Sequence, residues 1–214
     1  FDVSLAQKFE MKRIEKKDLV GIEPKLDGIR CFAIVEDGKA LLFARSGKLI
    51  PNFDNTIGTE LEKIGDGCYD GELMGDDFTA IMRQAYRKEN VDTTGTYLAL
   101  FDFLSLEEWR SGKTEMSCRD RREVLLDKMC DSEVNLNIIQ PVERHYVRPV
   151  LSEIMVSHDS FVSDGYEGAM IKDLDAPYKF GRGYEVMKLK SFHDVDLEIE
   201  SLEEGTGKFS GMLG

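Results

Sequence analysis

The chain is 214 residues long, 42% of them hydrophobic and 32% charged, with a formal net charge of −13 at pH 7. This composition is typical of a globular protein with a sizeable core, and no apolar run approaches the ~20 residues of a membrane-spanning helix. The acidic balance argues against nonspecific nucleic-acid binding by the whole surface. A nucleic-acid site would need basic residues segregated onto one face, or supplied by another part of the protein.

The cysteines and the N-terminal segment indicate a reducing compartment. Cys31, Cys68, Cys118 and Cys130 are scattered, with no CxxC pair. The N-terminal segment lacks the apolar core of a signal peptide. We therefore expect reduced thiols in a cytoplasmic interior and no zinc site.

Short apolar runs rich in β-branched and aromatic residues recur along the chain and predict strands. They lie at residues 18–23, 29–36, 40–45, 96–104, 136–141, 166–172, 185–190 and 195–201. Asp37–Gly38 falls between the second and third runs and predicts the turn of a hairpin.

Helical spacing of apolar residues predicts three helices, at 78–88, 117–130 and 150–163. In the second, Arg122, Leu125, Leu126 and Met129 share one face of the helix. In the third, Leu151, Ile154, Met155 and His158 do so. Strands, hairpins and helices are mixed without regular β-α-β alternation, which predicts an α+β fold of antiparallel sheets flanked by helices.

The stretch EPKLDGIR at residues 23–30 places Lys25 at the end of a predicted strand, with Asp27 and Gly28 close behind. An isolated lysine there is most often a side chain that keeps its charge in water at a strand edge. The alternative is a covalent nucleophile, because a neutral lysine amine attacks electrophiles well. The ordinary pKa of lysine, near ~10.4, keeps the amine charged, so a nucleophilic lysine needs burial or neighbouring cations.

Groups suited to such a site follow along the chain. Glu72 ends a short apolar strand in YDGEL, Phe101 lies in the buried-type strand LALFDFL, and Glu167 precedes an apolar stretch in DGYEGAMIK. In EVMKLK, the two-residue period of a strand places Lys188 and Lys190 on one face. Such a lysine pair is either a solvated edge or a phosphate-binding site, and most of the 41 acidic residues must be surface groups.

Taken in order, these segments resemble one family closely. KLDGIR, DGEL, FDFL, EGAMIK and MKLK are similar to the motifs of the nucleotidyltransferase domain of ATP-dependent DNA ligases. The same superfamily holds RNA ligases and mRNA capping enzymes. The resemblance covers about residues 23–190, and the short segment ahead of it is similar to compact phage and viral ligases. It implies an ATP-grasp-like α+β fold with the nucleotide between the sheets, and a cytoplasmic enzyme, in a bacterial host if phage-encoded.

The resemblance also implies a reaction, the ATP-dependent sealing of nicks in duplex DNA. A lysine attacks the α-phosphorus of ATP to form lysyl-AMP, AMP passes to the 5′-phosphate at the nick, and the 3′-hydroxyl displaces AMP. Each step is phosphoryl transfer, which depends on positioning and charge neutralisation. The implied partners are ATP, Mg²⁺ or Mn²⁺, and nicked duplex DNA, with the protein a monomer that avoids membranes. The implied catalytic residues are Lys25, Asp27, Arg30, Lys188 and Lys190.

Individual roles are implied by the matched motifs. Glu23 would accept a hydrogen bond from the adenine amino group, and Phe101 would stack on the adenine ring. Glu72 would hold a ribose hydroxyl. Glu167 would bind a divalent metal, with Glu72 as a second candidate ligand.

The phosphates would be held by cations. Lys188 and Lys190 would bind the α-phosphate and stabilise its developing charge. Arg30 would contact the ribose or the nick phosphate, and Arg45 the 5′-phosphate of the nick. Arg182 lies where related ligases carry a basic residue near the phosphates.

Residues 1–191 are expected to form the nucleotidyltransferase domain, and 192–214 the beginning of a C-terminal OB-fold domain. Two alternatives to a DNA ligase stay open. An RNA ligase or capping nucleotidyltransferase belongs to the same superfamily, although Arg30 and the FDFL strand favour a DNA ligase. A non-catalytic nucleic-acid-binding module is disfavoured because the five residues Lys25, Glu72, Glu167, Lys188 and Lys190 are intact.

Overall fold

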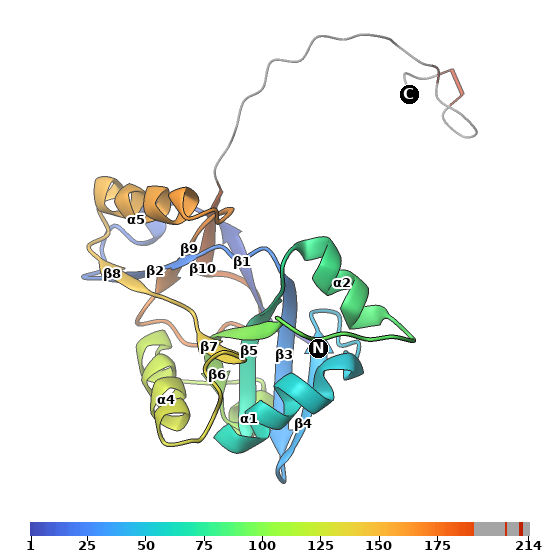
Figure 1. The fold of residues 1–214 in the computed structure, drawn as a ribbon. Helices are drawn as coiled ribbons and strands as arrows, with labels where there is room; N and C mark the ends of the chain where they lie inside the picture. Colours follow the sequence, from blue (N-terminus) through green and yellow to red (C-terminus); the bar gives the residue numbers. More distant parts are fainter. Residues whose placement is uncertain (191–203, 205–209, 212–214) are drawn as a thin grey trace.

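Two five-stranded sheets form the centre of the structure, a computed structural model that describes residues 1–190, 204, 210 and 211 (Figure 1). Sheet A has the order β1-β10-β9-β2-β8 and sheet B the order β4-β3-β5-β6-β7. All neighbouring strands are antiparallel except the parallel pairs β1–β10 and β6–β7. The predicted α+β fold with antiparallel sheets is therefore confirmed.

The strands of sheet A come from both ends of the described chain. They are β1 (Ser4–Lys8), β2 (Val20–Pro24), β8 (His145–Val147), β9 (Gly168–Asp173) and β10 (Gly181–Lys190). The strands of sheet B are β3 (Ile29–Glu36), β4 (Lys39–Ala44), β5 (Gly67–Met74), β6 (Tyr97–Leu104) and β7 (Ile139–Pro141).

Helices cover both sheets in Figure 1. The α-helices are α1 (Thr59–Ile64), α2 (Phe78–Tyr86), α3 (Leu106–Ser111), α4 (Cys118–Cys130) and α5 (Leu151–Ser163). The shorter turns are η1 (Met11–Arg13), η2 (Pro51–Phe53) and the π-helical η3 (Asp54–Gly58). Two of the predicted helices begin at side-chain caps: Asp77 accepts from the Ala80 N–H at 2.7 Å, and Ser117 from the Asp120 N–H at 3.1 Å.

Each sheet buries its own core. In sheet A, Ile22, Ile171 and Met187 pack with Ile154 and Phe161 of α5. Sheet B packs its strands against apolar residues of α1, α2 and α4. A third cluster joins the two sheets, because Val3 and Tyr178, next to β1 and β10, pack against Phe32, Cys68 and Leu104 of sheet B.

The structure confirms several predicted elements. The hairpin β3–β4 turns at Asp37 and Gly38, whose φ angles of 51° and 68° are both left-handed, as a two-residue primed turn requires. In α4, the residues predicted to share a face turn toward the core: Arg122, Leu125 and Met129 are buried, and Leu126 is half-buried.

Other predictions were wrong in detail. The expected strand at 136–141 is strand only at Ile139–Pro141. In α5, Ile154 and His158 of the predicted face are buried and Met155 is half-buried, but Leu151, the first residue of the helix, is 52% exposed. Ser157 and Phe161 occupy the buried face beside His158.

Two expectations concern residues that the structure describes only in part. The predicted strand at 195–201 and the OB-fold segment lie outside the described residues, apart from 204, 210 and 211. Among the described helices, none is long and apolar enough to cross a membrane. All four cysteines carry free thiols, and only Cys130 is exposed.

Candidate active site

A cavity of about 270 Å³ opens between the two sheets. Its lining includes eight of the residues that the sequence singles out: Glu23, Lys25, Arg30, Arg45, Glu72, Phe101, Arg182 and Lys188. These residues come from β2, β3, β5, β6, β10 and the adjoining loops, so the fold brings together groups up to 165 positions apart. Asp27, Glu167 and Lys190 lie outside the lining.

Lys25 leaves the end of β2 and is fixed by backbone contacts to the start of β9. Its N–H donates to the Gly168 carbonyl at 2.8 Å, and its carbonyl accepts from the Glu167 N–H at 3.3 Å. Gly168 has a φ of +146°, and a Cβ there would lie 2.2 Å from the Leu189 carbonyl oxygen. Only glycine allows β9 and β10 to approach so closely, which sets Glu167 beside Lys25.

The Lys25 Nζ forms an ion pair with Glu167, and Lys190 pairs with the other oxygen of the same carboxylate. Burial would raise the pKa of Glu167, but its contacts with Lys190 and Lys25 hold that pKa below its usual range. Lys190 is 43% exposed and reaches Glu167 instead of the cavity, whereas Lys188 lines the cavity. The two predicted phosphate-binding lysines thus occupy different surroundings.

Glu23 is 2% exposed and is held by two cations. Arg144 lies 2.7 Å from its Oε1, and Lys172 lies 3.0 Å from its Oε2. Burial alone would raise the pKa of Glu23, but the charges of Lys172 and Arg144 lower it, so the carboxylate is ionised. An ionised carboxylate is a pure acceptor, as the predicted contact with an amino group requires.

Phe101 turns into the cavity at an irregularity of sheet B. In the pairing of β5 with β6, Asp70 faces Asp102 while Gly71 faces Leu100, so Phe101 has no cross-strand partner. This is the pattern of a β-bulge, which re-aims side chains beside functional sites. The Phe101 ring lies 4.7 Å from the Arg30 guanidinium carbon and 4.9 Å from the Lys172 Nζ.

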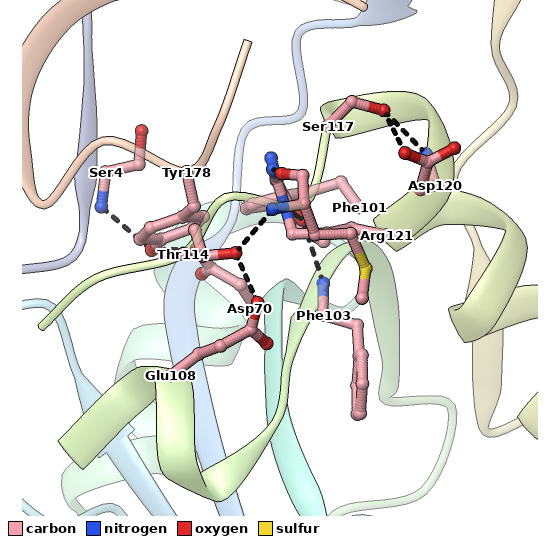
Figure 2. A network of polar contacts seen from close by, with 12 residues as sticks. Ser4, Asp70, Phe101, Phe103, Glu108, Thr114, Ser117, Asp120, Arg121 and Tyr178 are labelled. Carbon is pink, nitrogen blue, oxygen red and sulfur yellow. Dashed lines mark hydrogen bonds and ion pairs between the residues drawn. The ribbon is translucent and has the colours of Figure 1, made fainter. Parts of the chain in front are cut away.

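Arg30 points at the same cavity but is held by a buried network. Its Nε and Nη2 donate to the two oxygens of Asp70 at 2.5 Å and 2.6 Å. Figure 2 shows Asp70 beside Tyr178, whose hydroxyl donates to Asp70 at 2.7 Å and accepts from the Ser4 N–H at 2.8 Å. The network ties β1 to sheet B and fixes the direction of Arg30.

Glu72 lies at the end of β5, partly buried in the cavity wall. Burial raises its pKa to about 7, against the opposing effects of Arg30, the Gly28 backbone and Lys25. Near neutral pH, the side chain is therefore present in both protonation states. It could donate to a ribose hydroxyl or accept from one.

The outer residues are more exposed. Arg45 is exposed at the cavity, and Arg182 donates to the Ala6 carbonyl at 2.7 Å. Arg30, Arg45, Arg182 and Lys188 all line one cavity, together with the acidic side chains of Glu23, Asp70, Glu72 and Asp102. Asp27 is exposed and lies outside the lining, so its catalytic role stays a prediction.

Comparison with known proteins shows the family and the fold of the chain. A family model described as ATP dependent DNA ligase domain matches residues 4–190. The chain is 28% identical over 222 residues to a DNA ligase of Methanocorpusculum labreanum, covering 94% of this chain and 37% of that protein. A solved structure named Pmar-Lig_PreS3 is 33% identical with a TM-score of 0.86, covering 100% of this chain and 52% of that one. A Chlorella virus DNA ligase-adenylate shares the fold at 20% identity, with a TM-score of 0.69 over 88% of this chain and 67% of that one.

The chain belongs to the ATP-dependent DNA ligase domain family. It spans less than two fifths of the length of the Methanocorpusculum ligase. The roles of individual residues in this ligase-family domain stay predictions, since none of these matches tests them.

The carboxylates of this ligase-family domain fit a metal held mainly through a bound nucleotide. Among the described residues, no group of three or more His, Cys, Asp or Glu side chains could hold an ion. Mg²⁺ is commonly bound by one or two carboxylates together with substrate phosphates and water. Glu167 and Glu72 could supply such carboxylates, and Glu167 is partly exposed with a lowered pKa.

Sequence reasoning missed Arg144, Asp70 and Tyr178, and did not assign a role to Lys172. Arg144 contacts Glu23 across 121 positions of sequence, and Tyr178 contacts Asp70 across 108. Neither contact leaves a periodic or motif signal. Lys172, at the end of EGAMIK, and Asp70, the first residue of DGEL, stood in segments that the motifs marked, but neither was assigned a role.

Proposed function

We propose that this domain is the adenylation domain of an ATP-dependent DNA ligase and seals nicks through lysyl-AMP. The observation that carries the proposal is the meeting of Lys25, Glu72, Phe101 and Lys188 in one cavity between the sheets, in a chain matched by the ligase family model. The cavity offers an aromatic face for a base, a carboxyl group for a ribose and cations for phosphates.

In the first step, the Lys25 Nζ attacks the α-phosphorus of ATP. A P–N bond forms, the bond from the α-phosphorus to the bridging oxygen breaks, and pyrophosphate leaves with the electron pair. The Lys25 Nζ is paired with Glu167 in this structure, so the amine must leave Glu167 and release a proton to water before it attacks. Lys188 would then neutralise charge developing on the α-phosphate.

In the later steps, a 5′-phosphate oxygen of nicked DNA displaces Lys25 from AMP, and the 3′-hydroxyl then displaces AMP from the DNA. Arg45 would hold the 5′-phosphate of the nick, and Arg182, which lines the same cavity, would add a cation near the phosphates. A divalent cation bound with ATP would supply further charge neutralisation, and Glu167 and Glu72 are the side chains that could hold it. The proposal includes action in the cytoplasm as a monomer, and light scattering of the purified chain checks the monomeric state.

A sealing assay tests the proposal against the other members of the superfamily. The chain is incubated with Mg²⁺ and either ATP or GTP, together with a nicked duplex whose broken strand is DNA or RNA. A DNA ligase joins the DNA strand with ATP. Preferential joining of RNA would indicate an RNA ligase, transfer of GMP a capping enzyme, and absence of any covalent adduct a binding module.

A further inference from the structure

A buried cluster of charges joins the two sheets beside the cavity. Arg144 lies in the connection from β7 of sheet B to β8 of sheet A, and Lys172 lies on β9. Both cations contact the Glu23 carboxylate, through Nε at 2.8 Å and Nη2 at 2.7 Å for Arg144, and through Nζ at 3.0 Å for Lys172. All three side chains are at most 4% exposed.

The same two cations hold the backbone of Phe101 in the other sheet. The Phe101 carbonyl accepts from the Lys172 Nζ at 2.9 Å and from the Arg144 Nη2 at 3.4 Å. Because Phe101 is the bulged residue of β6, its position is not fixed by a cross-strand partner in β5. Arg144 and Lys172 therefore set the distance between the Glu23 carboxylate and the Phe101 ring.

The chain makes room for Arg144 at Gly21. A Cβ at Gly21 would lie 3.0 Å from the Arg144 Cδ and 3.1 Å from the Leu174 Cδ2. The Arg144 side chain thus lies against the bare backbone of β2, two residues before Glu23. Its remaining nitrogen, Nη1, is buried and has no hydrogen-bond partner among the described residues.

We propose that Arg144 is a positioning residue that sets the preference for adenine, an inference that rests on the proposed function. Adenine presents an amino donor at position 6, whereas hypoxanthine and guanine present a carbonyl oxygen there. A Glu23 carboxylate fixed at both oxygens accepts a hydrogen bond from the adenine amino group and repels the carbonyl oxygen of hypoxanthine or guanine. The planar fork of Arg144 directs Nε and Nη2 at the Glu23 Oε1, and Nη2 also reaches the Phe101 carbonyl. A lysine at this position would keep the charge but not the fixed geometry of the fork.

The test compares adenylation with ATP against its inosine analogue, which replaces the amino group at position 6 by oxygen. In Arg144→Lys, the buried charge is kept but the fork is lost. We expect the preference for ATP, measured as the ratio of the two second-order rates of adduct formation, to fall by at least about tenfold. Only the rate with ATP should fall, because inosine triphosphate has no amino group to donate to the fixed Glu23 carboxylate.

The matched control is Arg121→Lys. Arg121 forms a similar buried pair with Asp102, at 2.7 Å and 3.0 Å, but contacts neither Glu23 nor the Phe101 carbonyl. Arg121→Lys should slow adduct formation with ATP and with inosine triphosphate by the same factor. Gly21→Ala supplies a second variant that displaces Arg144 without changing a charge, and it should reduce the preference in the same direction.

The outcomes separate this inference from the proposed function. Suppose that Arg144→Lys and Gly21→Ala lower the rates of adduct formation with ATP and inosine triphosphate by the same factor, as is expected for Arg121→Lys. In that case Arg144 only supports the fold and the inference is wrong. If either variant fails to fold by near-ultraviolet circular dichroism, the other decides. A wild-type chain that forms no adduct with ATP would instead overturn the proposed function, and the inference with it.

Discussion

Because the pKa of Glu72 is raised in the folded protein, Glu72 should make the unfolding free energy depend on pH. Glu72→Gln should remove this contribution. Burial raises this pKa from its ordinary value of 4.5 to about 7. The folded state therefore binds more protons than the unfolded state between these limits, so stability falls as pH rises from about 4.5 to about 7 and levels off above. At ~1.4 kcal/mol for each pKa unit, the full loss is about 3 kcal/mol.

Glu72→Gln keeps the shape of the protonated side chain and cannot ionise. We expect the variant to match the wild type near pH 4.5 and to exceed its unfolding free energy by up to about 3 kcal/mol at pH 8. Urea unfolding of both proteins at pH 5, 6, 7 and 8 measures this difference. Glu107→Gln, at an exposed position in the first turn of α3, is the matched control and should leave the profile unchanged. Parallel pH profiles for wild type and Glu72→Gln would refute the reasoning.

Three further predictions concern the cavity. Phe101→Ala should weaken ATP use by roughly 1–3 kcal/mol while Phe101→Tyr is nearly neutral, because the ring face is what stacks; equal losses in adenylation assays would mean that Phe101 only packs. Asp70→Ala leaves Arg30 partly buried without its carboxylate and should cost about 3–5 kcal/mol in urea unfolding, and a loss under 1 kcal/mol would contradict the buried network. Glu167→Gln should raise the Mg²⁺ concentration for half-maximal adenylation several-fold; an unaltered Mg²⁺ dependence would remove Glu167 from the metal site.

Local chemistry explains which parts of the structure could be predicted. The turn at Asp37–Gly38 was visible because its residue types tolerate left-handed angles, and the α4 face because its spacing is regular. Motif resemblance extended this to the cavity, where Lys25 and Phe101 lie together although 76 positions separate them.

Features that depend on distant packing were not visible in the sequence. The bulge that turns Phe101 into the cavity depends on the register between β5 and β6, which no local pattern encodes. Arg144 was missed because its partner Glu23 lies 121 positions away in the sequence. The strand β1, SLAQK, was missed because it has no alternation of apolar and polar residues and is held by its pairing with β10.

The site of covalent adenylation tests the central claim most directly. The chain is incubated with labelled ATP and Mg²⁺, digested, and mapped by mass spectrometry, in parallel with Lys25→Arg, which keeps the charge but removes the nucleophilic amine. We predict one AMP group on Lys25, through an acid-labile and base-stable bond, and no adduct in the variant. An adduct on another lysine, or one that persists in Lys25→Arg, would contradict the assignment of Lys25 as the nucleophile.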